Sequence, residues 1–313
     1  MKVFWIVCLI LLILLLVVLA VYLLIGILSY KLALSRKGKI KKFIEKNFAK
    51  HLQTLNIDEK YFAEGFEKVV IRSEDNLKLV GFYKRCGANR IALLVHGYGG
   101  NHKEMSNYAK FFEKRGYDIF AVDMRCHGDS EGKDLTMGLK ESKDLLFWIN
   151  KILEINPHYK IALFGLSMGA STVCITCGEK LPNNVILAVE DCGYDNANKQ
   201  FYHVYKSKIH LKLFYNIFYN FTKKSRGLDL KKVDPALALK NSKIPIMFIH
   251  GGDDNFVPTN MVYSLSQYVP EQRKHVYVAD NAGHAGAYAE NPRRYESELS
   301  QFLSQFYMKK IGK

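Results

Sequence analysis

The chain divides into three zones by its pattern of apolar and polar positions. Residues 3–28 contain no charged side chain and are mostly Leu, Ile and Val. As a helix rising about 1.5 Å per residue, this run is about 39 Å long, which exceeds the roughly 30 Å hydrocarbon core of a bilayer. We therefore predict a membrane-spanning helix within residues 1–30. A small-residue triplet at 33–35 leaves a cleavable signal peptide as the alternative, although the apolar core of such a peptide is usually shorter.

The zone from about residue 65 alternates short apolar runs with helical stretches. Two runs, 69–72 and 77–83, flank a turn cluster and predict a hairpin. The remaining runs are apolar throughout, which is typical of parallel strands covered by helices on both faces. They predict strands at 91–95, 119–122, 161–164, 185–190, 246–250 and 276–278. We expect residues 65–313 to form one α/β domain with a mostly parallel, twisted sheet.

One segment of this zone breaks the alternation. Residues 195–232 mix many aromatic side chains with basic ones. An insertion between the strands of an α/β sheet often forms a lid or a binding loop. We predict a helical cap over the site, with contact to the membrane surface as a weaker hypothesis. The opposing interpretation is an ordinary helix whose aromatic side chains pack on the core.

Between the two zones lies a basic linker, residues 31–64, which we expect to be helical. Residues 31–50 hold eight Lys or Arg and one Glu, and supply about half of the net charge of +15. Such a cluster beside a membrane helix suits anionic lipid headgroups, and no nucleic-acid motif accompanies it. The positive-inside rule places the following domain in the cytoplasm, as part of a single-pass protein of the cell membrane. The opposite orientation, with Lys2 inside and the domain exported, stays open.

The most informative short motif is G-L-S-M-G at residues 165–169, directly after an apolar run. Glycines on both sides of a serine permit a sharp turn from strand to helix. Such a turn exposes the Ser167 Oγ near a helix N-terminus, which favours developing negative charge. The motif predicts a nucleophile if an oxyanion hole, an acid and a base occur in the matching order.

A glycine-rich stretch at residues 96–101 follows the strand at 91–95. Ligand sites in α/β sheets lie at the C-terminal ends of the strands. We predict that the backbone N–H groups of Tyr98 and Met168 form an oxyanion hole there. We interpret His96 as a structural residue of the turn, because the base is expected later in the chain.

An acid and a base follow two later strands. Asp253 and Asp254 come after the strand at 246–250, and a carboxylate at either position could hold an imidazole in the right tautomer. His284 comes after the strand at 276–278, among small residues. A histidine in such a loop suits contact with a substrate better than packing.

The chain order of Ser167, an aspartate and His284 is that of α/β-hydrolases. Several stretches together resemble this superfamily, in its serine-esterase and peptidase-like form, over about residues 65–308. They are H-G-Y-G-G-N at 96–101, D-M-R-C-H-G-D-S-E-G at 123–132, G-L-S-M-G at 165–169, H-G-G-D-D-N-F-V-P at 250–258 and A-G-H-A at 282–285. The second stretch departs from the family pattern, because Cys126 stands where glycine is usual.

The resemblance implies roles for individual residues. Its acid motif aligns with Asp254 rather than Asp253, so the implied triad is Ser167, Asp254 and His284. It implies a structural or site-lining role for Asp123 and His127, and we assign these two residues no catalytic role. Glu190 and Asp191 end a strand near the site and are interpreted as structural or site-edge residues; an alternative triad acid here is the weaker hypothesis.

The expected function is that of a membrane-anchored serine hydrolase acting on an ester, thioester or amide. His284 would act as general base, and water would hydrolyse the acyl-enzyme. The mechanism needs no cofactor and no metal. Cys174 and Cys177 form a C-x-x-C pair on a helix, without a second pair of ligands, and are interpreted as buried thiols.

We expect a small-molecule acyl substrate, lipophilic in view of the anchor, and leave the oligomeric state open. A serine peptidase, an acyltransferase and a non-catalytic scaffold of the same fold are the alternatives.

Overall fold

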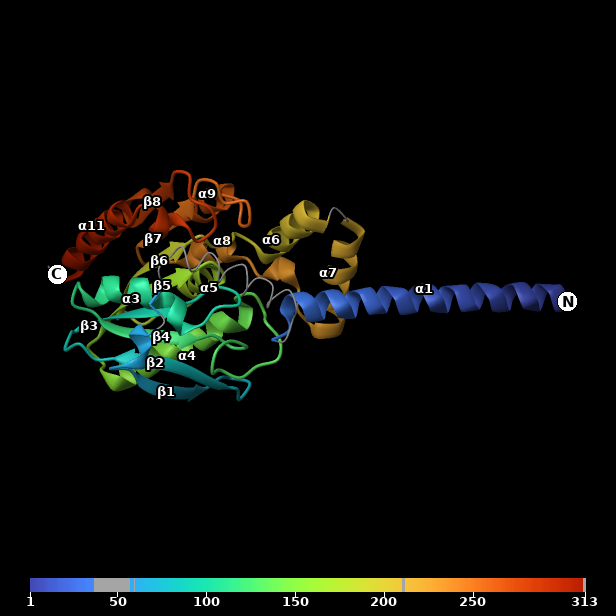
Figure 1. The fold of residues 1–313 in the computed structure, drawn as a ribbon, viewed down its shortest axis with the longest axis horizontal. Coiled ribbons are helices and arrows are strands. Elements are labelled where there is room, and N and C mark those ends of the chain that lie inside the picture. Colours follow the sequence, from blue (N-terminus) through green and yellow to red (C-terminus); the bar gives the residue numbers. More distant parts are fainter. Residues whose placement is uncertain (37–56, 59, 210–211, 312–313) are drawn as a thin grey trace.

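The computed structural model describes residues 1–36, 57–58, 60–209 and 212–311. A central sheet is covered by helices on both faces, and one long helix projects away from it (Figure 1). The strands are β1 (Glu67–Arg72), β2 (Lys78–Lys84), β3 (Arg90–Val95), β4 (Asp118–Asp123), β5 (Lys160–Leu166), β6 (Val185–Asp191), β7 (Ile246–Gly251) and β8 (Lys274–Ala279). The α-helices are α1 (Lys2–Leu34), α3 (Ser106–Glu113), α4 (Leu139–Ile155), α5 (Met168–Cys177), α6 (Ala197–Val204), α7 (Lys212–Arg226), α8 (Pro235–Ala238), α9 (Asn260–Ser266), α10 (Ala287–Glu290) and α11 (Pro292–Ile311).

Shorter helical turns connect these elements. The 3-10 turns are η1 (Tyr61–Ala63), η2 (His102–Met105), η4 (Leu230–Lys232), η5 (Leu239–Asn241) and η6 (Glu271–Arg273), and η3 (Tyr205–Ile209) is a π-helical turn.

The sheet is mostly parallel, with the order β1-β2-β4-β3-β5-β6-β7-β8. The hairpin of β1 and β2 is antiparallel, and β2 also pairs antiparallel with β4, whereas the pairs from β4 through β8 are parallel. Gly165 pairs with Val95 on one side and with Glu190 on the other, so β3, β5 and β6 end level with one another. The predicted α/β class and the hairpin are confirmed.

Alternate residues of each central strand enter two separate hydrophobic cores. In β3, Ile91 and Leu93 belong to the core that holds side chains of α4 and α5, while Ala92 and Leu94 belong to the core of α3 and α11. All four residues are fully buried. Burial on both faces explains why these strands read as continuous apolar runs in the sequence.

Helix α1 stands clear of the rest of the molecule for most of its length (Figure 1). It is the one helix in the described part of the chain that is long and apolar enough to cross a membrane, although a signal sequence passes the same test. Helix α1 is thus a candidate transmembrane segment. Its last turns are different, because Gly26, Tyr30, Ala33 and Leu34 are buried against the other elements.

The end of α1 joins the α/β domain directly. The helix continues to Leu34, past the predicted end of the membrane segment at residue 30. Ser35 then forms an antiparallel bridge with Asp134, and the Leu135 N–H donates to the Leu34 carbonyl at 2.8 Å. Residues 37–56 and 59 of the predicted basic linker lie outside the described residues, so that linker stays a prediction.

The aromatic segment at 195–232 contains α6, η3, α7 and η4. Helix α7 lies across α1 close to the α/β domain (Figure 1). A Cβ atom on Gly26 would lie 2.7 Å from the Phe221 ring, so only glycine permits this approach of α7 to α1. Tyr30 packs on the same ring, with centroids 6.1 Å apart. The segment is helical, and its role as a cap remains a proposal.

Candidate active site

The candidate nucleophile lies on a sharp turn between β5 and α5. Ser167 has φ 55° and ψ −117°, a backbone conformation that a non-glycine residue rarely adopts. The turn is tight, because a Cβ atom on Gly165 or Gly169 would overlap neighbouring backbone. Ser167 immediately precedes the first turn of α5, so its Oγ stands at a helix N-terminus.

The structure brings the three predicted triad residues together in one hydrogen-bonded chain. The Ser167 Oγ lies 2.8 Å from the His284 Nε2, and the His284 Nδ1 lies 2.7 Å from the Asp254 Oδ2. Asp253 is exposed and takes no part in this chain. The geometry therefore distinguishes between the two adjacent acids and selects Asp254.

Asp254 is held as an anion by its surroundings. Burial alone would raise its pKa, but the charge and hydrogen bonds of His284 and His250 hold the pKa well below its usual range. The other oxygen, Oδ1, accepts from the Phe256 and Val257 N–H groups at 2.9 and 2.8 Å. These bonds fix the carboxylate so that it can orient the imidazole and stabilise its protonated form.

His250 is a positioning residue that the sequence did not single out. Its Nε2 lies 3.3 Å from the Asp254 Oδ2 and 3.0 Å from the Val257 carbonyl oxygen, and its side chain is fully buried. Burial lowers the pKa of His250, but the Asp254 carboxylate outweighs this and raises it. The feature of the sequence that could have identified His250 is its position at the end of β7, four residues before Asp254.

The predicted oxyanion turn lies against the nucleophile. A Cβ atom on Gly97 would lie 3.3 Å from the Ser167 Cβ, and both Tyr98 and Met168 line the cavity next to Ser167. His96 is fully buried, and its Nε2 accepts from the Met124 N–H at 3.0 Å. This contact suits the structural role predicted for His96.

The loop after β4 forms hydrogen bonds with the predicted oxyanion turn and with the residues next to it. The His127 Nε2 accepts from the Gly99 N–H at 3.0 Å. The Asp123 Oδ1 accepts a hydrogen bond from the backbone N–H of His102 at 2.9 Å. The same oxygen lies 2.8 Å from the His102 Nδ1. Cys126 has φ 68°, a left-handed conformation that explains why glycine is usual at this position.

A cavity of about 90 Å³ adjoins Ser167, and its surface is almost wholly apolar. Phe201, Val204 and Tyr205 line it from α6 and η3, and Met137 lines it from the loop before α4. Ala33, in the last turn of α1, lines it as well. The Tyr98 hydroxyl donates to the Ala33 carbonyl oxygen at 2.6 Å, which ties the oxyanion turn to α1. The sequence drew attention to Ala33 only as part of a possible cleavage triplet, and not as a residue of the site.

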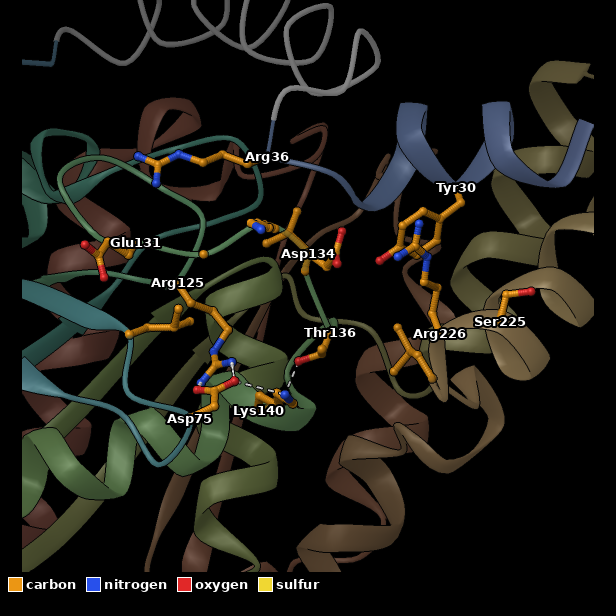
Figure 2. A pocket seen from close by; sticks show the side chains of 15 residues that line it. Tyr30, Arg36, Asp75, Arg125, Glu131, Asp134, Thr136, Lys140, Ser225 and Arg226 are labelled. Carbon is orange, nitrogen blue, oxygen red and sulfur yellow. Dashed lines mark hydrogen bonds and ion pairs between the residues drawn. The ribbon is translucent and has the colours of Figure 1, made fainter. Parts of the chain in front are cut away.

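A second cavity, of about 710 Å³, lies beside the end of α1, and its lining combines many charged residues with apolar ones (Figure 2). Arg125 forms hydrogen bonds with Asp144 at 2.6 Å and with Asp75 at 3.0 Å, and Lys140 donates to Asp75 at 2.9 Å. The side chains of Arg125 and Asp144 are almost fully buried. This network holds the loop after β4 on α4, and it contains none of the triad residues.

Buried groups near the site fit structural roles. Burial raises the pKa of Glu190 to about 8. Burial likewise raises the pKa of Asp191 to about 6, although the Tyr295 hydroxyl donates to it at 2.7 Å. Cys174 and Cys177 are buried free thiols whose pKa values are raised by burial, in agreement with their interpretation as packing residues.

Comparison with known proteins supports the fold. A model of serine aminopeptidases of the S33 type matches residues 88–224. The fold is similar to that of a solved esterase from Pyrococcus furiosus, Pf2001, with a TM-score of 0.65 and 25% identity over 80% of this chain and 93% of that chain. The chain has the α/β-hydrolase fold.

Other known proteins are similar to this chain as well. An acylaminoacyl peptidase from Pyrococcus horikoshii shares the fold, with a TM-score of 0.57 and 21% identity over 78% of this chain and 42% of that chain. In sequence, the α/β-hydrolase is 27% identical to YqkD of Bacillus subtilis (strain 168) over 220 residues, which cover 67% of this chain and 70% of that protein. Its neighbours thus include both esterases and peptidases.

Proposed function

We propose that this α/β-hydrolase is a membrane-anchored serine hydrolase that cleaves carboxylic esters through an acyl-enzyme on Ser167. The observation that carries the proposal is the unbroken hydrogen-bonded chain from the Ser167 Oγ through His284 to Asp254, at 2.8 and 2.7 Å. A serine, an imidazole and a buried carboxylate in this order are the parts of a nucleophilic acyl-transfer site.

The first half of the reaction acylates the serine. His284 Nε2 takes the proton of Ser167, while Oγ attacks the carbonyl carbon of the ester. The oxyanion that forms accepts hydrogen bonds from the N–H groups of Tyr98 and Met168. The bond to the leaving oxygen then breaks, and that oxygen takes the proton from His284. Asp254 stabilises the imidazolium between these two steps.

The second half of the reaction restores the enzyme. Water attacks the acyl carbonyl and gives a proton to His284 Nε2. The bond between the carbonyl carbon and the Ser167 Oγ breaks, Oγ recovers the proton from His284, and the carboxylic acid leaves. If an alcohol replaces water at this stage, the enzyme is an acyltransferase of the same mechanism.

The apolar cavity supports an acyl substrate over a peptide. Its lining by Phe201, Val204 and Tyr205 offers no charged group to a peptide N-terminus. The competing candidate is a serine peptidase, which the match to the serine aminopeptidase model favours.

Two assays test this function. A fluorophosphonate probe is expected to label the wild type, and labelling that persists in Ser167→Ala would refute the nucleophile. Rates on nitrophenyl esters of graded acyl length are then compared with rates on aminoacyl nitroanilides. Faster turnover of the anilides would make the protein a peptidase.

We further propose that α1 spans the cell membrane and that the α/β domain faces the cytoplasm. The basic residues after α1 support this orientation through the positive-inside rule. Cys86 is an exposed free cysteine of the α/β domain. A membrane-impermeant maleimide should therefore label Cys86 in lysed cells and not in intact cells. A Cys86→Ser variant controls for labelling elsewhere, and labelling of intact cells would reverse the topology.

A further inference from the structure

The last turn of α1 belongs to the wall of the cavity that adjoins Ser167. Ala33 is 5% exposed and lines the cavity, and its carbonyl oxygen accepts from the Tyr98 hydroxyl at 2.6 Å. One residue, Tyr98, therefore contributes the proposed oxyanion donor through its N–H and holds the membrane helix through its side chain. An anchor that served only as a tether would have no part in this wall.

Another part of the wall comes from α6 and η3. Val204 and Tyr205 face the cavity from these two elements. Tyr205 also lies near Ser29, which is one turn before Ala33 on α1. The cavity is therefore bounded on more than one side by α1 or by residues that lie near α1.

The position of the cavity along α1 sets its depth relative to a bilayer. Ala33 lies five residues beyond Leu28, the last residue of the uncharged apolar run, which is about 7.5 Å along the helix axis. The polar interface of a bilayer is about 5–7.5 Å thick on each side of the hydrocarbon. With Leu28 at the edge of the hydrocarbon, the cavity would lie at the outer limit of this interface, within reach of lipid headgroups.

The size of the cavity limits what it holds by itself. A volume of about 90 Å³ corresponds to about three water-sized groups of roughly 30 Å³ each. Only the first carbons of an acyl chain fit into it. The rest of a longer chain must leave the cavity, and Ala33 is the lining residue that α1 contributes.

We propose that the substrate of this α/β-hydrolase is an acyl ester resident in the bilayer, and that its chain leaves the catalytic cavity along α1 past Ala33. Ala33 is a specificity-determining residue, because its methyl group fixes the width of the route. The proposal rests on the ester hydrolysis proposed above and adds to it the source of the ester and the path of its chain.

The test uses the full-length protein in nanodiscs. Its two substrates, 4-methylumbelliferyl oleate and 4-methylumbelliferyl acetate, share the same leaving group and differ only in the acyl chain. The readout is the ratio of kcat/KM for the oleate to kcat/KM for the acetate. Ala33→Leu narrows the route and should lower this ratio at least tenfold. Ala33→Gly widens it and should raise the ratio at least threefold.

The matched control is Ala20→Leu, the same substitution on an exposed position of α1 within the apolar run, which should leave the ratio unchanged. Ratios for both Ala33 variants within twofold of the wild type would overturn the proposal. Fluorophosphonate labelling reports whether each variant is folded. If Ala33→Leu is not labelled, the ratio measured for Ala33→Gly alone tests the proposal. A wild type that is not labelled and cleaves neither ester would refute the proposed function itself.

Discussion

The triad and the wall of the cavity are held in different ways. Ser167, Asp254 and His284 follow the ends of β5, β7 and β8 in one sheet, and backbone groups fix Asp254 directly. The wall is assembled from distant segments, α1, the loop before α4, and α6 with η3, and both backbone bonds and side-chain contacts join α1 to the rest. Chemistry thus depends on the sheet, whereas the shape of the cavity depends on contacts that single substitutions can change without moving the triad.

The largest effect should come from the triad itself. Asp254→Asn keeps the shape of the side chain but removes the charge that orients His284 and stabilises the imidazolium. We expect kcat for ester hydrolysis to fall by about 10⁴-fold, as in other serine hydrolases of this mechanism. The neighbouring Asp253→Asn is the matched control, because Asp253 is exposed. A larger loss for Asp253→Asn than for Asp254→Asn would contradict the geometry described here.

Next in size is the buried ion pair that holds the loop after β4. Arg125→Met leaves Asp144 buried without its partner, and such a loss typically costs about 3–5 kcal/mol of folding free energy. Thermal unfolding should show a large drop in Tm. The double variant Arg125→Met, Asp144→Leu should recover most of it, because no charge then remains buried. A single variant as stable as the wild type would show that the ion pair of Arg125 with Asp144 carries no stability.

The third prediction concerns the pH dependence of stability. The pKa of Glu190 is raised to about 8 in the folded chain by burial, above its ordinary value of 4.5. The folded state therefore binds this proton more tightly, so Glu190 contributes a loss of stability that grows as the pH rises from about 4.5 to 8. Glu190→Gln should raise Tm at pH 8.5 by more than it does at pH 5. An equal change at both pH values would show that Glu190 titrates normally.

The smallest effect should come from the link between the two regions. Tyr98→Phe removes the hydrogen bond to the Ala33 carbonyl oxygen and keeps the Tyr98 N–H. A lost hydrogen bond of this kind costs about 1 kcal/mol, so Tm should fall by a few degrees. The ratio of oleate to acetate hydrolysis should shift by less than in the Ala33 variants. A total loss of activity would place the Tyr98 hydroxyl in the chemistry instead.

The sequence was sufficient for the strands and for the three residues that the structure brings together as the proposed triad. Continuous apolar runs predicted the central strands, because these are buried on both faces of the sheet, and the turn cluster between β1 and β2 predicted the hairpin. Ser167 lies in a recognisable local motif, because the turn at the end of β5 requires glycine two residues before it and two residues after it. Asp254 was separated from Asp253 by resemblance, and the hydrogen bond to His284 supplies the physical reason.

The residues that line the cavity are not marked by a comparable pattern in the sequence. Ala33 is an ordinary residue of a helix, and its importance arises only where α1 meets Tyr98 and η3. Gly26 likewise looks in the sequence like any other glycine of an apolar run. Its role becomes visible only in the structure, where Phe221 packs against it. Contacts between segments far apart in the chain depend on tertiary packing, which periodicity and short motifs do not encode.

The direct junction between α1 and the α/β domain changes how this protein would meet its substrates. Ser35 pairs with Asp134 immediately after α1 ends, so α1 joins the α/β domain without a spacer at this point. Helix α7 packs across α1 at Gly26 and gives α1 a second contact with the domain. If α1 spans a membrane as proposed above, these two contacts would hold the domain at one height over the bilayer. The protein would then meet a membrane ester by lateral diffusion in two dimensions, and the turnover rate would follow the surface density of that ester rather than its concentration in solution.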